Sequence, residues 1–69
     1  MNREVVFLVK EMPQGGYSAR ALGYRIFMEI SDIAQLHQRV RDAVQGYFRE
    51  EEPPQAIQLH YLRNETIPV

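Results

Sequence analysis

The sequence predicts an α+β domain in two layers, in which one helix packs on one face of a small β-sheet and the elements follow the order β-β-β-α-β. The first observation is the stretch Asp32–Arg49, where apolar residues recur at spacings of three and four, as they do on one side of an α-helix. The second is that the rest of the chain consists of short runs rich in β-branched and aromatic residues, separated by glycine and proline turns. The helix needs an apolar surface to cover, and one face of a sheet supplies it. The apolar residues of the helix are Ile33, Leu36, Val40, Ala43, Val44, Tyr47 and Phe48.

The chain of 69 residues has the length of a single domain, residues 1–69. A domain of this size buries about 60% of the surface that its unfolded chain exposes, so its core is thin. The chain has no cysteine, so neither disulfides nor a thiolate metal site can reinforce it. We therefore expect self-association to supplement the packing of the core.

The net charge is −1, with eight Lys and Arg against nine Asp and Glu, which is too balanced to attract phosphate backbones over the whole surface. No apolar run approaches the roughly 18 residues of a membrane span. The apolar centre of the N-terminus, Val5–Val9, is also too short for a signal peptide. We expect a cytoplasmic protein that does not associate with membranes, and the absence of cysteine agrees with a reducing compartment.

The first predicted strand is Glu4–Met12, and the alternation of its side chains places apolar residues on both faces. Such a strand lies in the interior of a sheet, or its second face meets a partner. The turn Pro13–Gly16 and the second strand, Tyr17–Leu22, follow. One face of the first strand carries Val5, Phe7 and Val9, and the other carries Val6, Leu8 and Lys10.

The second strand carries Ala19 and Ala21 on one face, which leaves room for bulky aromatic residues of the helix. Gly23 marks a tight return into the third strand, Tyr24–Ile30, whose Phe27 is apolar but points away from the helix. The connections between these three strands are too short for anything but an antiparallel meander.

Ser31 or Asp32 caps the helix, and Gln35 lies at the capping-box spacing from Asp32. Inside the helix, Gly46 costs up to about 1 kcal/mol relative to alanine. We interpret this glycine as permitting a close approach between the helix and the sheet.

The acidic run Glu50–Glu52 opposes the helix dipole, and the prolines that follow it cannot continue a helix. The helix should therefore end by Arg49 or Glu50. Ala56–Leu62 alternates cleanly and is the fourth predicted strand. One of its faces carries Ile57, Leu59 and Tyr61, and the other carries Gln58 and His60.

The order of these elements, together with three short motifs, resembles the small HicB-like antitoxin family over nearly the whole chain. The motifs are a hairpin with two glycines, a tyrosine and an alanine, then the centre of the helix, then a strand that follows proline. They comprise Gly15, Gly16, Tyr17 and Ala19, then Val40–Val44, then Pro54, Ile57 and Leu59.

The resemblance implies a partial ribonuclease H-like fold with strand order 3-2-1-4, in which the fourth strand runs parallel to the first after a right-handed crossover. It also implies a non-enzymatic antitoxin that binds and neutralises a small basic HicA-type toxin, which cleaves mRNA, and that forms homodimers or tetramers. Longer members of the family carry a C-terminal DNA-binding domain. Because only seven residues follow Leu62, we expect that domain to be absent.

No constellation of residues predicts a catalytic, cofactor-binding or metal site. The acidic residues are interpreted as solvated charges or, for Asp32, as a helix cap, rather than as the converging carboxylates of a two-metal nuclease. His37 and His60 are the only histidines, and a zinc site needs further ligands, none of them available from cysteine. We therefore expect no enzyme activity and no cofactor.

The remaining prediction is that the chain binds another protein, and it depends on two features. The sheet face away from the helix is expected to be apolar, which is typical of an interface, and the acidic run would attract a basic partner. That face serves either self-association or the toxin, and exposed edge strands offer a third route. The predicted interface residues are Val6, Leu8, Phe27, Glu50, Glu51, Glu52, His60 and Leu62.

The alternative is an orphan domain that binds nucleic acid or a small ligand. Arginines and tyrosines would form a stacking platform on the sheet if they shared a face. In the second strand, however, Tyr17 and Arg20 point to opposite faces, and the net charge is balanced, so we do not expect direct binding to nucleic acid. The residues considered for this platform are Arg20, Arg25, Arg63, Tyr17, Tyr24 and Tyr61.

Overall fold

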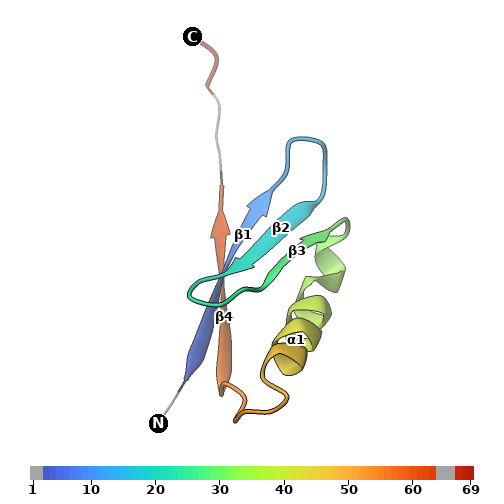
Figure 1. Cartoon of the computed structure of the whole chain (residues 1–69). Helices are drawn as coiled ribbons and strands as arrows, with labels where there is room; N and C mark the ends of the chain where they lie inside the picture. The colour runs from blue at the N-terminus through green and yellow to red at the C-terminus, as the bar shows by residue number, and fades with distance from the viewer. Residues whose placement is uncertain (1–2, 64–66) are drawn as a thin grey trace.

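The computed structural model describes residues 3–63 and 67–69, and it has the predicted two layers, with one helix on one face of a four-stranded sheet (Figure 1). The strand order is β3-β2-β1-β4. Strands β1, β2 and β3 form an antiparallel meander, and β4 pairs with β1 in parallel. These findings confirm the predicted α+β fold and the order 3-2-1-4. The elements are β1 (Glu4–Glu11), β2 (Tyr17–Ala21), β3 (Phe27–Ile30), a 3₁₀ turn (Ile33–Gln35), α1 (Leu36–Tyr47) and β4 (Ala56–Leu62).

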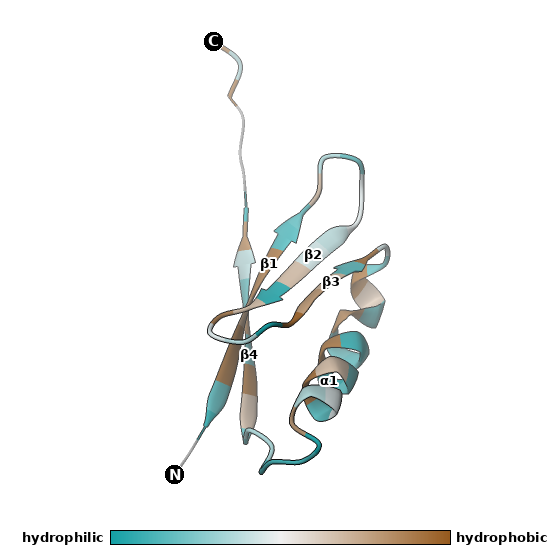
Figure 2. Ribbon diagram, viewed as in Figure 1, coloured by the Kyte–Doolittle hydropathy of each residue, from teal (hydrophilic) through white to brown (hydrophobic). Residues whose placement is uncertain are grey.

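The core lies between α1 and the face of the sheet that carries Val5, Phe7 and Val9 of β1. Ala19 and Ala21 of β2 are buried on this same face, opposite the helix, as the alternation of the strand predicts. In Figure 2, the middle of β1 and parts of α1 have the brown colour of hydrophobic residues. The buried residues are Val5, Phe7, Val9, Ala19, Ala21, Ile26, Ile30, Leu36, Val40, Val44 and Phe48.

The α-helix begins later than predicted, because a 3₁₀ turn precedes it, and it ends at Tyr47, before the predicted limit of Arg49 or Glu50. Asp32 caps the 3₁₀ turn, where its carboxylate accepts a hydrogen bond from the Ala34 amide at 2.9 Å. At the other end, the Phe48 amide still donates to the Val44 carbonyl, but the backbone of Phe48 has already left helical geometry. Three acidic residues beyond this point would meet the negative end of the helix dipole, which accounts for the early end.

Strand β3 also begins later than predicted, at Phe27 rather than Tyr24. The Ala21 amide donates to the Ile26 carbonyl at 3.0 Å, which closes a loop over residues 22–25 where a tight return was expected. Tyr24 leaves the sheet and packs edge-to-face on Tyr47 and Phe48, at centroid distances of 5.7 and 5.1 Å. The aromatic cluster of these three residues therefore outweighs the strand propensity of the segment.

Two glycines have opposite roles in the backbone. Gly16 has a φ of +85°, and a β-carbon there would lie 3.0 Å from the Ile30 carbonyl oxygen, so the hairpin requires glycine. Around Gly46, in contrast, nothing lies within 4 Å of an added β-carbon. The interpretation that Gly46 permits a close approach to the sheet is therefore wrong.

We predict that Gly46→Ala raises the free energy of unfolding by up to about 1 kcal/mol, because the site is open and alanine favours the helix. Urea unfolding followed by circular dichroism measures this change. Gly16→Ala is the matched variant, and it should lower stability by about 1 kcal/mol or more because of its positive φ and the nearby carbonyl. A loss of stability in Gly46→Ala would contradict the open environment of the helix glycine.

Candidate binding surfaces

The face of the sheet away from α1, here called the outer face, brings together five of the predicted interface residues. The strand register aligns Phe27, Arg20, Leu8 and His60 in one row that crosses all four strands. In the neighbouring rows, β1 and β4 place Val6 opposite Gln58 and Lys10 opposite Leu62. The predicted residues on this face are Val6, Leu8, Phe27, His60 and Leu62.

The outer face is less uniformly apolar than predicted. Phe27 is 61% exposed and Leu62 is 47% exposed, whereas Val6 and Leu8 are half-buried. Arg20 lies between Phe27 and Leu8 in the central row, so a cationic side chain interrupts the apolar surface. A partner on this face must therefore satisfy one guanidinium as well as apolar side chains.

A polar chain runs along the outer side of β1 and β4, and sequence reasoning missed it. The Gln58 side-chain amide donates to the Glu4 carboxylate at 2.6 Å, and the His60 ring nitrogen Nε2 lies 3.3 Å from the Gln58 amide oxygen. The parallel register that places Glu4 beside Ala56 brings these side chains within reach. Glu4 is exposed, in agreement with its interpretation as a solvated charge, and it also accepts this hydrogen bond.

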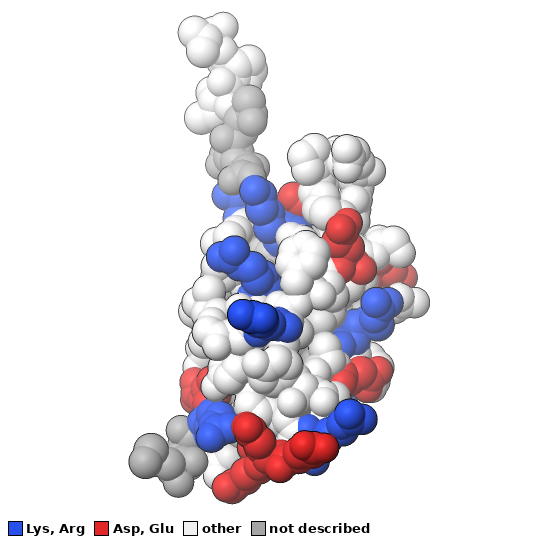
Figure 3. Space-filling view, in the orientation of Figure 1, with Lys and Arg blue, Asp and Glu red and all other residues white. Residues whose placement is uncertain are grey.

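The acidic run Glu50–Glu52 is exposed, but it lies in the connection from α1 to β4 and not on the outer face. Arg3 links this connection to the start of β1, because its guanidinium lies 3.6 Å from the Glu51 carboxylate and 5.7 Å from the centre of the Phe48 ring. Figure 3 shows acidic side chains gathered at this end of the molecule and basic side chains further along the visible face. The apolar outer face and the acidic run are therefore separate parts of the molecule and do not form one surface.

A second surface lies on the helix side, where α1 leaves β4 partly uncovered. A helix is about 10 Å wide with its side chains, whereas four strands spaced about 4.8 Å apart span more than that. The helix-facing residues Ile57 and Leu59 are consequently only half-buried, and Tyr61 is 54% exposed. A single helix cannot cover the whole face of this sheet.

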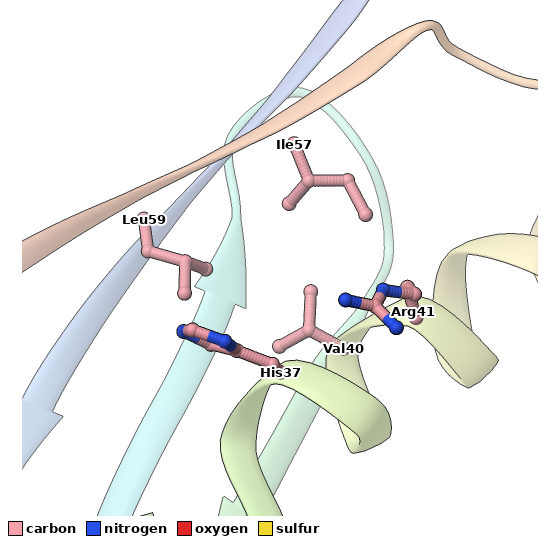
Figure 4. Close-up of a pocket in the computed structure, with 5 residues that line it drawn as sticks. All are labelled: His37, Val40, Arg41, Ile57 and Leu59. Atoms are coloured by element: carbon pink, nitrogen blue, oxygen red, sulfur yellow. The ribbon is translucent and has the colours of Figure 1, made fainter.

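The uncovered strip forms a groove of about 180 Å³ between α1 and β4. Figure 4 shows Ile57 and Leu59 of β4 directed toward Val40 of α1, with His37 and Arg41 on either side. His37 lies at the edge of the apolar stripe, as predicted, but the groove itself was not predicted. The sequence did contain a feature that indicates such a groove, namely a fourth strand with three apolar residues on the face toward a single helix.

The surfaces are made of exposed and half-buried side chains, and none of the residues in 3–63 and 67–69 is a buried polar or charged one. Over the same residues, no group of three or more His, Asp or Glu side chains is arranged to hold a metal ion. Nor is any helix in this part of the chain long and apolar enough to cross a membrane. The arrangement offers apolar contacts, edge hydrogen bonds and surface charges.

These features define a class of protein, namely small two-layer α+β domains in which one helix covers part of a four-stranded sheet. Comparison with known proteins places the chain more narrowly. It is 46% identical over 50 residues to a UPF0150 protein of Archaeoglobus fulgidus, covering 72% of this chain and 74% of that protein. It is 30% identical over 67 residues to a UPF0150 protein of Thermotoga maritima, covering 97% and 94%. The chain belongs to the UPF0150 family.

No protein-family model matches the chain, and no solved structure matches it. The two relatives support membership of the family, and the fold described above rests on the structure of this chain.

We predict that two phenylalanines differ sharply in their effect on stability. Phe48→Ala should lower the free energy of unfolding by about 3–5 kcal/mol, because Phe48 is buried between the helix and the sheet. Phe27→Ala should change it by less than about 0.5 kcal/mol, because that ring is mostly exposed. Urea unfolding of both variants checks this prediction. A large loss in Phe27→Ala would mean that this ring stabilises the monomer instead of being available to a partner.

Proposed function

We propose that this protein is a non-enzymatic protein-binding module, a short HicB-like antitoxin that binds and neutralises a small basic HicA-type toxin, which cleaves mRNA, and that self-associates through its sheet. The observation that carries the proposal is the exposed Phe27, which shares with Leu8 and Val6 a sheet face that no element of residues 3–63 covers, although Arg20 lies between Phe27 and Leu8. The resemblance to HicB-like antitoxins over nearly the whole chain supports it. So does the agreement between the strand order and the order that this resemblance implies.

The charges on the two sides of this surface indicate how a basic toxin would be oriented. Glu50–Glu52 and Glu4 lie at the end where β1 and β4 begin, and they would attract the basic part of the partner. Lys10 and Arg20 lie further along the outer face and would repel it. The toxin therefore docks with its basic side toward the acidic end, and with apolar or acidic groups over Phe27 and Arg20.

Neutralisation by this route needs no chemistry on the antitoxin. A toxin that cleaves mRNA must bind RNA, and a protein that covers its RNA-binding surface stops it by exclusion. The exposed apolar residues supply contact area, and the acidic run speeds the encounter through long-range attraction that salt screens. The groups on this chain act by position and charge alone.

One observation favours a second candidate function, the binding of single-stranded nucleic acid. Phe27, Arg20 and His60 share one row of the outer face, and Lys10 lies in the next row. Aromatic and cationic side chains on a sheet are the groups on which bases stack and phosphates bind. This row differs from the platform of arginines and tyrosines considered from the sequence. Tyr17, one member of that platform, packs against the core. The acidic end and the balanced net charge weigh against this function.

We predict that co-expression of this protein rescues the growth of cells that express a HicA-type toxin encoded beside its gene. Phe27→Glu should abolish rescue, because it removes the exposed aromatic ring and places a carboxylate opposite Arg20 in the middle of the contact surface. Ile33→Glu is the matched control, since Ile33 is also exposed but lies in the 3₁₀ turn that leads into α1, and it should rescue fully. Growth curves, with the amount of each variant checked by immunoblot, give the measurement.

The nucleic-acid candidate makes the opposite prediction. It would be supported if the protein is retained on a single-stranded RNA column at physiological salt and Arg20→Gln is not retained. The same candidate predicts no rescue from any HicA-type toxin.

For the proposed antitoxin, rescue by Phe27→Glu equal to that by the unmodified protein would contradict the docking surface.

A further inference from the structure

Strand β4 forms an edge of the sheet that lacks the usual protection against pairing. It has seven residues and, within residues 3–63, pairs with β1 alone, so the backbone groups on its other side point outward. Ala56–Leu62 contains neither lysine nor proline, the residues that commonly block exposed edges. The opposite edge, β3, has only four residues, one of them Glu29. The long edge is therefore the one that is suited to receive another strand.

Strand β4 also has incompletely buried apolar side chains on both of its faces. Ile57 and Leu59 are half-buried, and Tyr61 is 54% exposed, on the face toward α1. Leu62 is 47% exposed on the outer face. These apolar side chains lie along the same strand as the open backbone edge, so the strip is suited to a partner that supplies both hydrogen bonds and apolar contacts.

We propose that the partner is a second copy of this chain, whose β4 pairs antiparallel with β4 of the first about a two-fold axis at Leu59, joining the two sheets into one. This inference rests on the part of the proposed function that has the chain self-associate, and it does not depend on a toxin. An interface of this kind is isologous, since the same residues of each copy meet.

The sequence of β4 is self-complementary in this register. Leu59 meets Leu59 of the second copy, Ile57 meets Tyr61, and Gln58 meets His60. Apolar residues thus face apolar residues, polar residues face polar ones, and both helices lie on the same side of the joined sheet. Moving the axis to His60 would place Ile57 opposite Arg63 and Gln58 opposite Leu62. Moving the axis to Gln58 would place Leu62 opposite Pro54, which lies outside β4.

The charges at the two ends of β4 also select the antiparallel arrangement. Glu4 lies beside the start of β4, and Glu50–Glu52 precede it in the connection from α1. Lys10 lies beside the end of the strand, and Arg63 follows it. Antiparallel pairing brings the acidic end of each copy to the basic end of the other, at both ends of the seam. Parallel pairing would place like charges together, which disfavours it.

The groove on the helix side supplies a further fit. Tyr61 of the second copy would lie next to Ile57, at the groove that His37 and Arg41 flank. An aromatic ring is the kind of group that fills an apolar groove beside a guanidinium. Each copy would thus cover the strip that the single helix of the other leaves open.

The test measures the oligomeric state of the purified full chain by sedimentation equilibrium, without any other protein. The unmodified protein should be a dimer, and Tyr61→Lys should weaken dimerisation at least about tenfold, because symmetry places the charge at two positions of the seam. Phe27→Lys is the matched control, since it exchanges an exposed aromatic residue for lysine at the other edge of the sheet. It should leave the dimer intact.

A cysteine substitution tests the register. The chain has no cysteine, so Leu59→Cys creates a single thiol. Residues opposite each other on antiparallel strands have Cα atoms about 4.5–5.5 Å apart, which lies within the disulfide range of about 4.4–6.8 Å. Leu59→Cys should therefore form a covalent dimer under mild oxidation on a non-reducing gel. Phe27→Cys should form much less in the same time.

Several outcomes would overturn the proposal. They are a monomer at all concentrations, a dimer that Phe27→Lys dissociates while Tyr61→Lys does not, and equal cross-linking of the two cysteine variants. Because these measurements involve no toxin, a failure here leaves the growth rescue experiment unaffected. A failure of rescue likewise leaves the dimer result standing.

Discussion

The structure depends on the packing of one helix against a sheet that is wider than the helix. Leu36, Val40 and Val44 pack on the face formed by β1, β2 and β3, and Phe48 closes the end of this layer. Two further aromatic rings, from Tyr24 and Tyr47, pack edge-to-face around Phe48. With so little else to bury, the domain concentrates its stability in this layer, and β4 is held mainly through its ladder to β1.

This arrangement separates the two surfaces that remain open. The outer face has its most exposed apolar residue, Phe27, on β3, whereas the helix-side strip follows β4 at the opposite edge. Pairing of two β4 strands would keep both outer faces on one side of the joined sheet. Self-association and capture of a partner are therefore geometrically compatible, and a dimer would present two docking faces side by side.

Much of the fold was predictable because the relevant signals are local. The alternation in Ala56–Leu62 gave the bounds of β4, and the apolar spacing in α1 identified its buried face. The predictions failed where a tertiary contact outweighs a local preference. Tyr24 has the propensity of a strand residue but packs with other aromatic rings. The error at Gly46 has another cause, because the spacing of residues along the helix does not indicate that this position is open.

The candidate surfaces were predictable in part for the same reason. Strand parity places Leu8 and Phe27 on the outer face without knowledge of the register. The neighbours of those residues depend on strand pairing, which brings Arg20 between them and joins Glu4 to Gln58. The groove depends on the width of the helix relative to the sheet, a quantity that appears only when the elements are assembled.

His60 shows why the docking face and the dimer seam have to be tested by substitutions at residues that belong to only one of them. Its side chain lies in the row with Leu8 on the outer face, close to Gln58, and in the proposed dimer it would also face Gln58 of the second copy. A substitution there would disturb both the docking face and the seam, so its effect would not distinguish them. Phe27 and Tyr61 lie on opposite faces and opposite edges of the sheet, which lets each report on one surface alone.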